Sequence, residues 1–354
     1  MKLTIDPTQF DIFVGIDVDR KSYAVTYLDH QFQGRSLKMP SDSKALLQYF
    51  KKHFPDKRLV FAYEAGPTGF ELHDYLTSLG YVCLVIHPAS LKSAPNECAK
   101  TNRIDSRKIV EQLKAGQLKG IHVPCGSYRA LRHLTQLREQ YARLLTRSKQ
   151  RIKAFLLFEH IDVPPYTGQQ IYTAKFRPIL KNLPLASELR FKLDMLLDDL
   201  DHVRQRLLSV LQELRAFCEK EPPIQKNLRY LQSIPGFGFI VSSFVLARIG
   251  DPAHLSNIRE LAAFCGIVPR EYSTGDTVNR GSITHMGNRT FRQLLVEAAW
   301  VAIRKDAELR NFFWRIRTRT QKSHGIRIAI VAVARKLSQR AYRVLKDQRE
   351  YFVH

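Results

Sequence analysis

Three acidic residues lie in or beside apolar segments in the first third of the sequence, where a carboxylate is costly to bury unless a cation or a hydrogen-bond donor meets it. Asp17 lies inside one apolar stretch, Glu64 ends another, and Asp105 begins a helix-like segment after a polar loop. Hard divalent cations prefer oxygen ligands, and carboxylates that converge on Mg²⁺ support in-line phosphoryl displacement. We therefore predict that Asp17, Glu64 and Asp105 form a catalytic site that binds Mg²⁺.

Each of these acids also has an ordinary structural explanation. Asp17 can be a hydrogen-bonded turn residue, Glu64 a solvent-facing strand end, and Asp105 a helix N-terminal charge that the macrodipole stabilises. Taken one at a time, these explanations are the better ones. The occurrence of all three acids at the ends of elements, in a chain that is otherwise basic, favours the metal site.

The elements that would position these acids form an α/β layer, because the apolar residues switch between strand spacing and helix spacing. The pattern predicts strands at 12–18, 22–29, 34–40, 58–64 and 81–87, and helices at 42–53 and 69–79. The first three strands can pair through short turns, whereas parallel strands require crossover helices, so the sheet is predicted to be mixed. If the first and fourth strands are neighbours at its centre, Asp17 and Glu64 converge there.

The sequence beyond residue 120 is predicted to be mainly helical. Apolar residues recur at helical spacing between basic residues from 127 to about 160, and a repeat of 3.5 residues runs from Leu193 to Phe217. Such a repeat specifies an apolar seam between paired helices, which forms either with the preceding helix of the same chain or in a dimer. Pro222 and Pro223 end this segment, and a compact, mostly helical region follows.

Length and charge limit the class of protein. The 354 residues are enough for two or three domains. The chain has 56 Lys and Arg against 33 Asp and Glu, a net charge of +23, and 39 of the basic residues lie beyond residue 120. This surplus favours nucleic acid as partner, while the hydrophobic content of 44% excludes a mainly disordered basic tail. We predict an α/β domain at 1–120, a basic helix and coiled-coil segment at 121–221 and a mostly α-helical domain at 222–354.

Cysteine usage and hydropathy indicate a protein of the reduced cytosol. The five cysteines are scattered and form no Cys-x-x-Cys pair, which argues against a disulfide framework and against a zinc site. The N-terminal residues lack the apolar core of a signal peptide, and no apolar run is long enough for a membrane helix. We therefore expect a cytoplasmic protein with no membrane partner.

Two features of the last third of the sequence indicate contact with DNA. Gly236 and Gly238 lie in a turn before an apolar helix, as in a helix-hairpin-helix, where glycines let backbone N–H groups reach a phosphate. Four further residues predict an anion-binding surface, namely Arg280, Asn288, Arg289 and Arg292. Both features also have explanations without DNA. The glycine turn can be only a tight connection between two helices, and the four polar residues can form an ordinary solvated surface.

An aromatic run near the C-terminus lies among arginines and consists of Phe312, Phe313 and Trp314. Such rings can stack on unpaired bases, as they do in proteins that bind single strands or RNA. Aromatic clusters at helical spacing more often belong to a hydrophobic core, so we predict a core role for this run.

Several motifs together resemble a known family. Three N-terminal segments resemble the RuvC-like, RNase H-fold domain of the DEDD insertion-sequence transposases. The segments are FVGIDVDRKSYAVTYLD, FAYEAGPTGFELHDYLTSLGYVCLVIHP and KTNRIDSRKIVEQL. These transposases are relatives of a pilin-gene DNA invertase. The C-terminal region resembles the transposase domain of that family in LQSIPGFGFIVSSFVLARIGD, LAAFCGIVPREYSTGDTVNRGSITHMGN and RQLLVEAAW. The resemblance spans nearly the whole chain in order. It implies a transposase or site-specific DNA recombinase of a mobile element, with a bacterial-type cytosolic, nucleoid-associated location.

The resemblance places the acids of the family on named positions. Its first Asp falls on Asp17, its Glu on Glu64 and its last Asp on Asp105, with Mg²⁺ as the implied cofactor. The remaining Asp is replaced by Asn102 in the sequence Lys-Thr-Asn. An Asn side chain offers a carbonyl oxygen but no charge, so Asn102 is kept as a site residue at which Mg²⁺ is expected to bind more weakly.

The resemblance also implies a hydroxyl nucleophile that attacks a DNA phosphate and becomes covalently linked to it. In the family a Ser precedes a Gly, and here Gly275 follows Ser273 and Thr274. Alignment on Gly275 favours Thr274, whereas Ser273 is the less hindered hydroxyl, so both remain candidates. A Ser-Thr-Gly turn that only caps the next segment is the structural alternative.

The family further implies a composite active centre between subunits of a homo-oligomer, a dimer or tetramer, and a noncoding bridge RNA that selects DNA by base pairing. Two other functions stay open from the residues alone. One is a metal-dependent junction endonuclease without a covalent intermediate. The other is an inactive nucleic-acid-binding remnant, because Asn102 and Thr274 depart from the family pattern.

Overall fold

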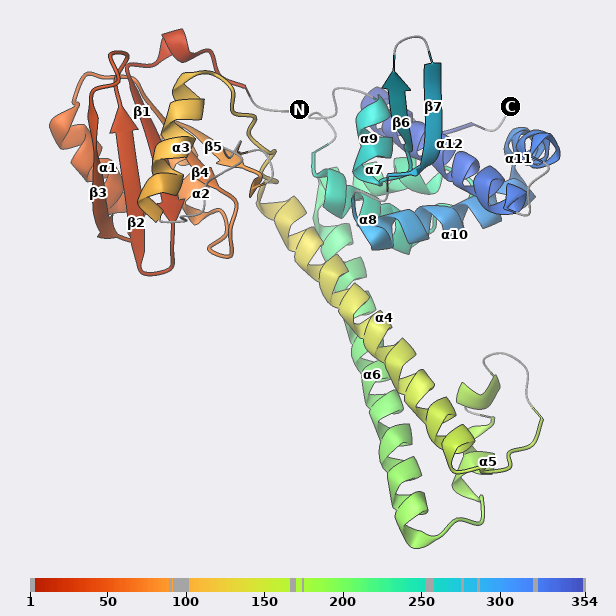
Figure 1. The fold of residues 1–354 in the computed structure, drawn as a ribbon. Coiled ribbons are helices and arrows are strands. Elements are labelled where there is room, and N and C mark those ends of the chain that lie inside the picture. The colour runs from red at the N-terminus through yellow and green to blue at the C-terminus, as the bar shows by residue number, and fades with distance from the viewer. Residues whose placement is uncertain are drawn as a thin grey trace. The chain divides into compact units, whose positions relative to one another are not determined.

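The computed structural model describes residues 4–88, 91, 102–165, 170–173, 175–251, 258–274, 277–284, 287–320 and 324–352 (Figure 1). The chain divides into two compact units, Met1–Val123 and Pro124–His354. Each unit has a hydrophobic core of its own. The segment predicted as a separate coiled coil, 121–221, lies almost entirely in the second unit.

The first unit is built on a five-stranded sheet in the order β3-β2-β1-β4-β5. The strands are β1 (Ile12–Val18), β2 (Ser22–Leu28), β3 (Gly34–Pro40), β4 (Leu59–Glu64) and β5 (Val82–Ile86). β1 is antiparallel to β2, to which a short turn joins it. It is parallel to β4, and β2, β3 and the helix at 43–53 lie between these two strands in the chain. The prediction of a mixed sheet with its first and fourth strands adjacent at the centre is confirmed.

Helices cover both faces of this sheet. They are α1 (Ser43–His53), α2 (Glu71–Ser78) and α3 (Asn102–Lys114), and a short 3-10 helix, η1 (Pro7–Gln9), precedes β1. Val14 and Ile16 of β1 belong to the core beneath α1 and α2, whereas Phe13 belongs to the core beneath α3. Side chains alternate between the two faces along a strand, so Asp17 follows Phe13 onto the α3 face.

The second unit begins with two long helices, α4 (Gly126–Phe158) and α6 (Ser187–Lys220), which lie side by side in Figure 1. Residues near the start of α4 share a core with the end of α6, and the end of α4 shares a core with the start of α6, so the pair is antiparallel. The short helices η3 (Gln170–Tyr172) and α5 (Arg177–Lys181) lie between them in the chain. Of the two arrangements left open for the apolar seam, the structure contains the hairpin within one chain.

The rest of the second unit is mostly helical, as predicted. Its helices are α7 (Pro222–Gln232), α8 (Phe239–Ile249), α9 (Ile258–Phe264), α10 (Arg289–Lys305), α11 (Ala307–Arg319) and α12 (Gly325–Asp347). An antiparallel hairpin, β6 (Pro269–Thr274) with β7 (Thr277–Ile283), interrupts them and was not anticipated. Among the residues that the structure describes, no helix has both the length and the apolar character to cross a membrane.

Candidate functional site

The register of the central strands places two of the predicted acids next to each other. β1 and β4 run parallel, and Ile16 is paired with Tyr63. The next position on each strand is therefore Asp17 on β1 and Glu64 on β4. Both residues are partly buried, whereas the positions before them are buried in the core.

Helix α3 brings the third acid to the same face of the sheet. Gly15 precedes Asp17 by two residues and so lies on the same face of β1. A Cβ atom at Gly15 would come within 2.4 Å of the carbonyl oxygen of Ser106 and within 2.6 Å of the amide nitrogen of Val110. The backbone of α3 thus lies directly against β1, and Asp105 precedes Ser106 in the first turn of that helix.

A buried hydrogen bond fixes α3 at this place. The hydroxyls of Thr26 and Ser106 lie 2.8 Å apart, and the Thr26 hydroxyl is also 2.9 Å from that of Ser36. Thr26 is paired with Gly15 in the β1–β2 register, so the hydrogen bond and the close backbone approach act at the same point. A buried hydroxyl without a partner would be destabilising, so this pairing holds the first turn of α3 beside β1.

The carboxyl group of Asp17 is affected by the charges of the other two acids. Burial raises the pKa of Asp17 above its ordinary value, and the negative charges of Asp105 and then Glu64 raise it further. Lys108 Nζ lies 3.9 Å from Oδ1 of Asp105. Asp17 therefore lies near enough to Asp105 and to Glu64 to be affected by both charges, which is the condition that a bound cation would relieve.

The donor set of this acidic site suits a hard divalent cation, because it consists of carboxylate oxygens. Within the described part of the chain, however, no three His, Cys, Asp or Glu side chains are grouped closely enough to form a metal site. Asn102 begins α3, three residues before Asp105, and its side chain lies outside what the structure describes. The carboxylate oxygens thus suit a metal ion as ligands. The described side chains, however, do not lie close enough together to form its coordination shell.

The two candidate nucleophiles end β6. Ser273 is paired with Val278 and Thr274 with Thr277, so both lie in the last paired positions before the hairpin turn. Arg280 is paired with Glu271 on the same hairpin. The side chains of these strand residues lie outside the described part of the structure.

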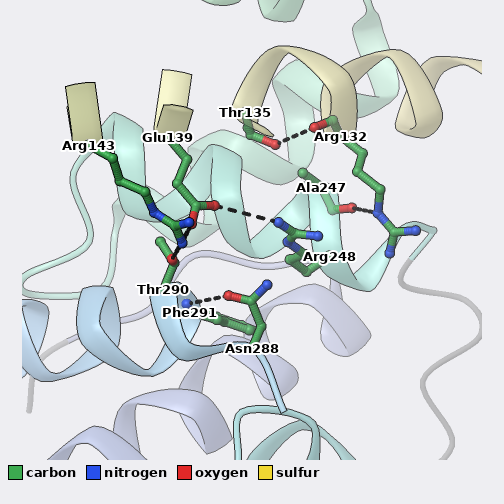
Figure 2. Close-up of polar contacts among 9 residues, drawn as sticks. All are labelled: Arg132, Thr135, Glu139, Arg143, Ala247, Arg248, Asn288, Thr290 and Phe291. Carbon is green, nitrogen blue, oxygen red and sulfur yellow. Dashed lines mark hydrogen bonds and ion pairs between the residues drawn. The ribbon is translucent and has the colours of Figure 1, made fainter. Parts of the chain in front are cut away.

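Two of the three predicted anion-binding residues around α10, Asn288 and Arg292, have hydrogen-bond partners within the second unit. The Asn288 side chain accepts a hydrogen bond from the Phe291 amide at 2.9 Å and caps the helix (Figure 2). Arg292 donates to the carbonyl of Cys265 at 3.3 Å, and Arg289 is exposed. Of the three, Arg289 is thus the one left exposed for a ligand.

The turn with the two glycines has a packing explanation at one position. Gly236 has a φ of +89°, and a Cβ atom there would come within 2.2 Å of the Ala298 carbonyl oxygen on α10. Gly238 is the N-cap of α8, and no atom lies within 4 Å of where its Cβ would be. Close packing therefore requires Gly236, while the space at Gly238 leaves the α8 N-terminus approachable.

Sequence reasoning missed a group of partly buried arginines where α4, α8 and α10 meet (Figure 2). Burial lowers the pKa of Arg132, Arg138 and Arg248. Glu139 accepts hydrogen bonds from Arg143 and Thr290, and its other oxygen is 3.8 Å from Arg248. Basic positions on a helix usually indicate a solvated face, so no signal in the pattern separated these arginines from the exposed ones.

Comparison with known proteins finds transposase relatives for both units of the chain. A model of the DEDD transposases of the IS110 group, described as Transposase, matches residues 14–161. A second model, described as Transposase IS116/IS110/IS902 family, matches residues 228–314. The first match contains Asp17, Glu64 and Asp105, and the second contains Ser273 and Thr274.

Three relatives illustrate the range of similarity. A putative transposase y4qE of Sinorhizobium fredii is 28% identical, over 96% of this chain and 90% of the relative. A transposase for insertion sequence element IS1533 of Leptospira borgpetersenii is 23% identical over 82% of this chain and 84% of its own. A pilin gene-inverting protein of Moraxella bovis is 24% identical over 44% of this chain and 48% of its own.

The fold and the two family matches define the class as insertion-sequence transposases. Within that class, the chain carries the two transposase domains of the IS110/IS116 family.

Proposed function

We propose that this protein is a transposase of a mobile insertion sequence that cuts and rejoins DNA at a composite centre. The acidic site, Asp17, Glu64 and Asp105 with Asn102, would hold Mg²⁺, and Ser273 or Thr274 would form the bond to DNA. The observation that supports the acidic site is the placement of its residues: Asp17 and Glu64 follow paired positions of the parallel strands β1 and β4, and the backbone of α3, which carries Asp105, lies against β1. The charges of Asp105 and Glu64 raise the pKa of Asp17, and repulsion of this kind is typical of sites that bind a divalent cation.

The reaction balances without any external energy source. The hydroxyl oxygen of Ser273 or Thr274 attacks a DNA phosphorus and gives up its proton. The bond from phosphorus to the leaving strand breaks, and the released strand oxygen takes up a proton to become a hydroxyl. Attack by a strand hydroxyl on the protein–DNA phosphodiester then restores the protein hydroxyl and joins the DNA. When bound, Mg²⁺ would neutralise charge that develops on the phosphate oxygens.

The partners follow from charge and from the family. The net charge of +23 suits DNA, and phosphate neutralisation by basic helices does not depend on sequence. A noncoding bridge RNA and assembly into a dimer or tetramer are part of the proposal. The family membership supports both, and the basic helix α4 offers a surface on which such an RNA can lie.

The test is covalent trapping on a suicide DNA substrate that prevents rejoining. We expect a protein–DNA adduct in the full chain with Mg²⁺, its loss in the Ser273→Ala and Thr274→Ala double variant, and its loss in Asp17→Asn. The single variants identify the nucleophile, and Ser282→Ala on β7 is the control from the same hairpin. Cleavage that persists without an adduct in the double variant would instead indicate the junction endonuclease.

The inactive remnant is tested on the same substrate. If the native chain forms no adduct while Asn102→Asp combined with Thr274→Ser does, the protein is a nucleic-acid-binding remnant. An adduct formed by the native chain excludes that function.

A further inference from the structure

The two tryptophans of the chain border one surface pocket on the second unit. Trp300 lies on α10 and Trp314 on α11, and the pocket they line has a volume of ≈ 620 Å³. Their side chains are 38% and 56% exposed. Large apolar side chains exposed together on a surface usually mark a place where something binds.

The aromatic run predicted to belong to the core does so only in part. Phe313 is 5% exposed and packs in the core, as predicted. Its ring lies 5.9 Å from the Trp300 ring and 5.4 Å from the Trp314 ring, between centroids. Phe313 therefore anchors two indole rings that remain open to solvent, which gives them a fixed position without burying them.

The charged side chains that line this pocket, among the described residues, are all positive. Arg304, Arg310 and Arg317 line it, and none of the described residues that line it is acidic. Arg310 is held by hydrogen bonds to the carbonyls of Ile303 and Arg304, at 3.0 and 2.8 Å. Flat aromatic surface beside arginines, without carboxylates, is the combination that binds unpaired bases together with their phosphates.

A second copy of the same chain fits this surface poorly. In a two-fold symmetric contact the same patch occurs on both subunits, so the arginines of one pocket would face those of the other. Such like-charge contact is unfavourable. Duplex DNA also fits poorly, because its bases are stacked on one another and do not reach a side-chain ring.

We propose that the tryptophan pocket, formed by Trp300, Phe313 and Trp314 with Arg304, Arg310 and Arg317, binds an unpaired nucleobase of single-stranded nucleic acid. The indole rings stack on bases, and the arginines contact the flanking phosphates. This binding requires neither the acidic site nor the hydroxyl nucleophile, so it goes beyond the proposed strand transfer. A DNA strand and an RNA strand share this chemistry.

The test uses the intrinsic fluorescence of the full chain, since both of its tryptophans line the pocket. We expect oligo(dT), oligo(U) or both to quench this fluorescence at saturation, and a blunt duplex of equal length to quench much less. The two single strands show whether the source is DNA or RNA. Equal quenching by the duplex would overturn the assignment to an unpaired base.

Variants test the pocket by the affinity for a labelled single strand. Trp314→Ala should weaken binding about 5- to 150-fold, the range of one base stack (~1–3 kcal/mol), and Trp314→Phe should retain part of the affinity. Arg317→Gln should lower the salt slope by about 0.7, as loss of one phosphate contact does for single strands. Phe191→Ala and Arg206→Gln, exposed on α6, are the matched controls and should change neither quantity.

Three outcomes would reject the tryptophan pocket as a base-binding site. They are no binding of single strands, unchanged affinity in Trp300→Ala and Trp314→Ala, and a loss of self-association in these variants while strand affinity stays constant. Covalent trapping is measured on the same preparations. If the protein forms the DNA adduct but does not bind bases, only the proposal for the tryptophan pocket is wrong. If single strands still quench the fluorescence but no adduct forms, only the strand-transfer proposal is wrong.

Discussion

Gly15 of β1 lies so close to Ser106 of α3 that a side chain at Gly15 could not be accommodated without moving the helix, since a Cβ atom would come within 2.4 Å of the Ser106 carbonyl oxygen. The obstructing atoms belong to the backbone of α3, which cannot swing aside as a flexible side chain can. The distance between strand and helix at this point therefore sets where the first turn of α3, and with it Asp105, lies relative to Asp17.

Gly15→Ala should consequently impair both folding and the acidic site. We expect a loss of at least about 1–3 kcal/mol in the free energy of unfolding, as for overpacking, and a weaker DNA adduct at temperatures where the variant is folded. Urea unfolding and the trapping assay measure the two effects. Gly126→Ala, where no atom lies within 4 Å of the added Cβ, is the control, and equal behaviour of the two variants would contradict the packing argument.

The hydrogen bond between Thr26 and Ser106 should contribute to the same placement. Ser106→Ala leaves the buried Thr26 hydroxyl with fewer partners, so we expect a cost of about 1–3 kcal/mol. A double-mutant cycle with Thr26→Val should show coupling, because the second change adds less once the first has removed the bond. Thr77→Val, on the exposed side of α2, should cost under about 0.5 kcal/mol. Additive effects at Thr26 and Ser106 would mean that their hydroxyls do not cooperate.

Much of the first unit could be predicted from the sequence because its signals are local. Strand alternation and the lengths of the connections determine which strands pair antiparallel and which pair parallel, so the order around β1 and β4 follows. The role of Gly15 was available in principle, since a glycine inside an apolar strand often marks close approach of another backbone. The start of α3 at Asn102, three residues before Asp105, was not singled out, because Thr101, Asn102 and Asp105 are all residue types that favour a helix start.

The second unit shows what patterns do not reveal. The β6–β7 hairpin carries polar and charged residues with little alternation, so its strands have no hydrophobic signature. The burial of Arg248, whose side chain is 12% exposed, results from helices that are distant in sequence. Likewise Phe313 and Trp314 are neighbours in one helix, and only tertiary packing decides that the first is buried and the second exposed.

A buried ion pair in the second unit makes a prediction about stability alone. Asp306 is fully buried and accepts a hydrogen bond from Arg340 at 2.6 Å, while it also caps α11 through the Leu309 amide. Removal of the cation in Arg340→Gln leaves a buried carboxylate without its charge partner, so we expect a loss of about 3–5 kcal/mol. Chemical denaturation checks this value. The exposed Arg343→Gln on the same helix should change stability by less than about 0.5 kcal/mol, and a similar small effect at Arg340 would show that the pair is not needed.

The raised pKa of Asp17 predicts how stability depends on pH in the absence of metal. Because burial and the charges of Asp105 and Glu64 raise this pKa in the folded state, protonation of Asp17 favours folding. That stability is complete below the ordinary value of 3.8 and is lost as pH rises through the higher pKa of the folded state. The Asn side chain in Asp17→Asn does not titrate. In EDTA, the stability of this variant relative to the native chain should therefore increase as pH rises from 3.8 through the pKa of Asp17 in the folded state.

Urea unfolding at a series of pH values checks the effect, with the exposed Asp56→Asn as control. Parallel profiles for the native chain and Asp17→Asn would mean that the three acids do not interact in the folded state. If the stability of Asp56→Asn relative to the native chain increases by the same amount, the effect is caused by the net charge of the chain.

Asn102 provides the sharpest test of metal binding, because in the proposed site it stands where the family has an Asp. Asn102→Asp should lower stability in EDTA, since a fourth carboxylate adds repulsion, and should tighten Mg²⁺ binding. A ligand present at about 100 times its Kd stabilises the folded state by about 2.7 kcal/mol, so the rise in Tm with Mg²⁺ reports the site. We expect this rise to be larger in Asn102→Asp than in the native chain and absent in Asp17→Asn. If Mg²⁺ raises the Tm of all three proteins equally, the acids do not hold the metal.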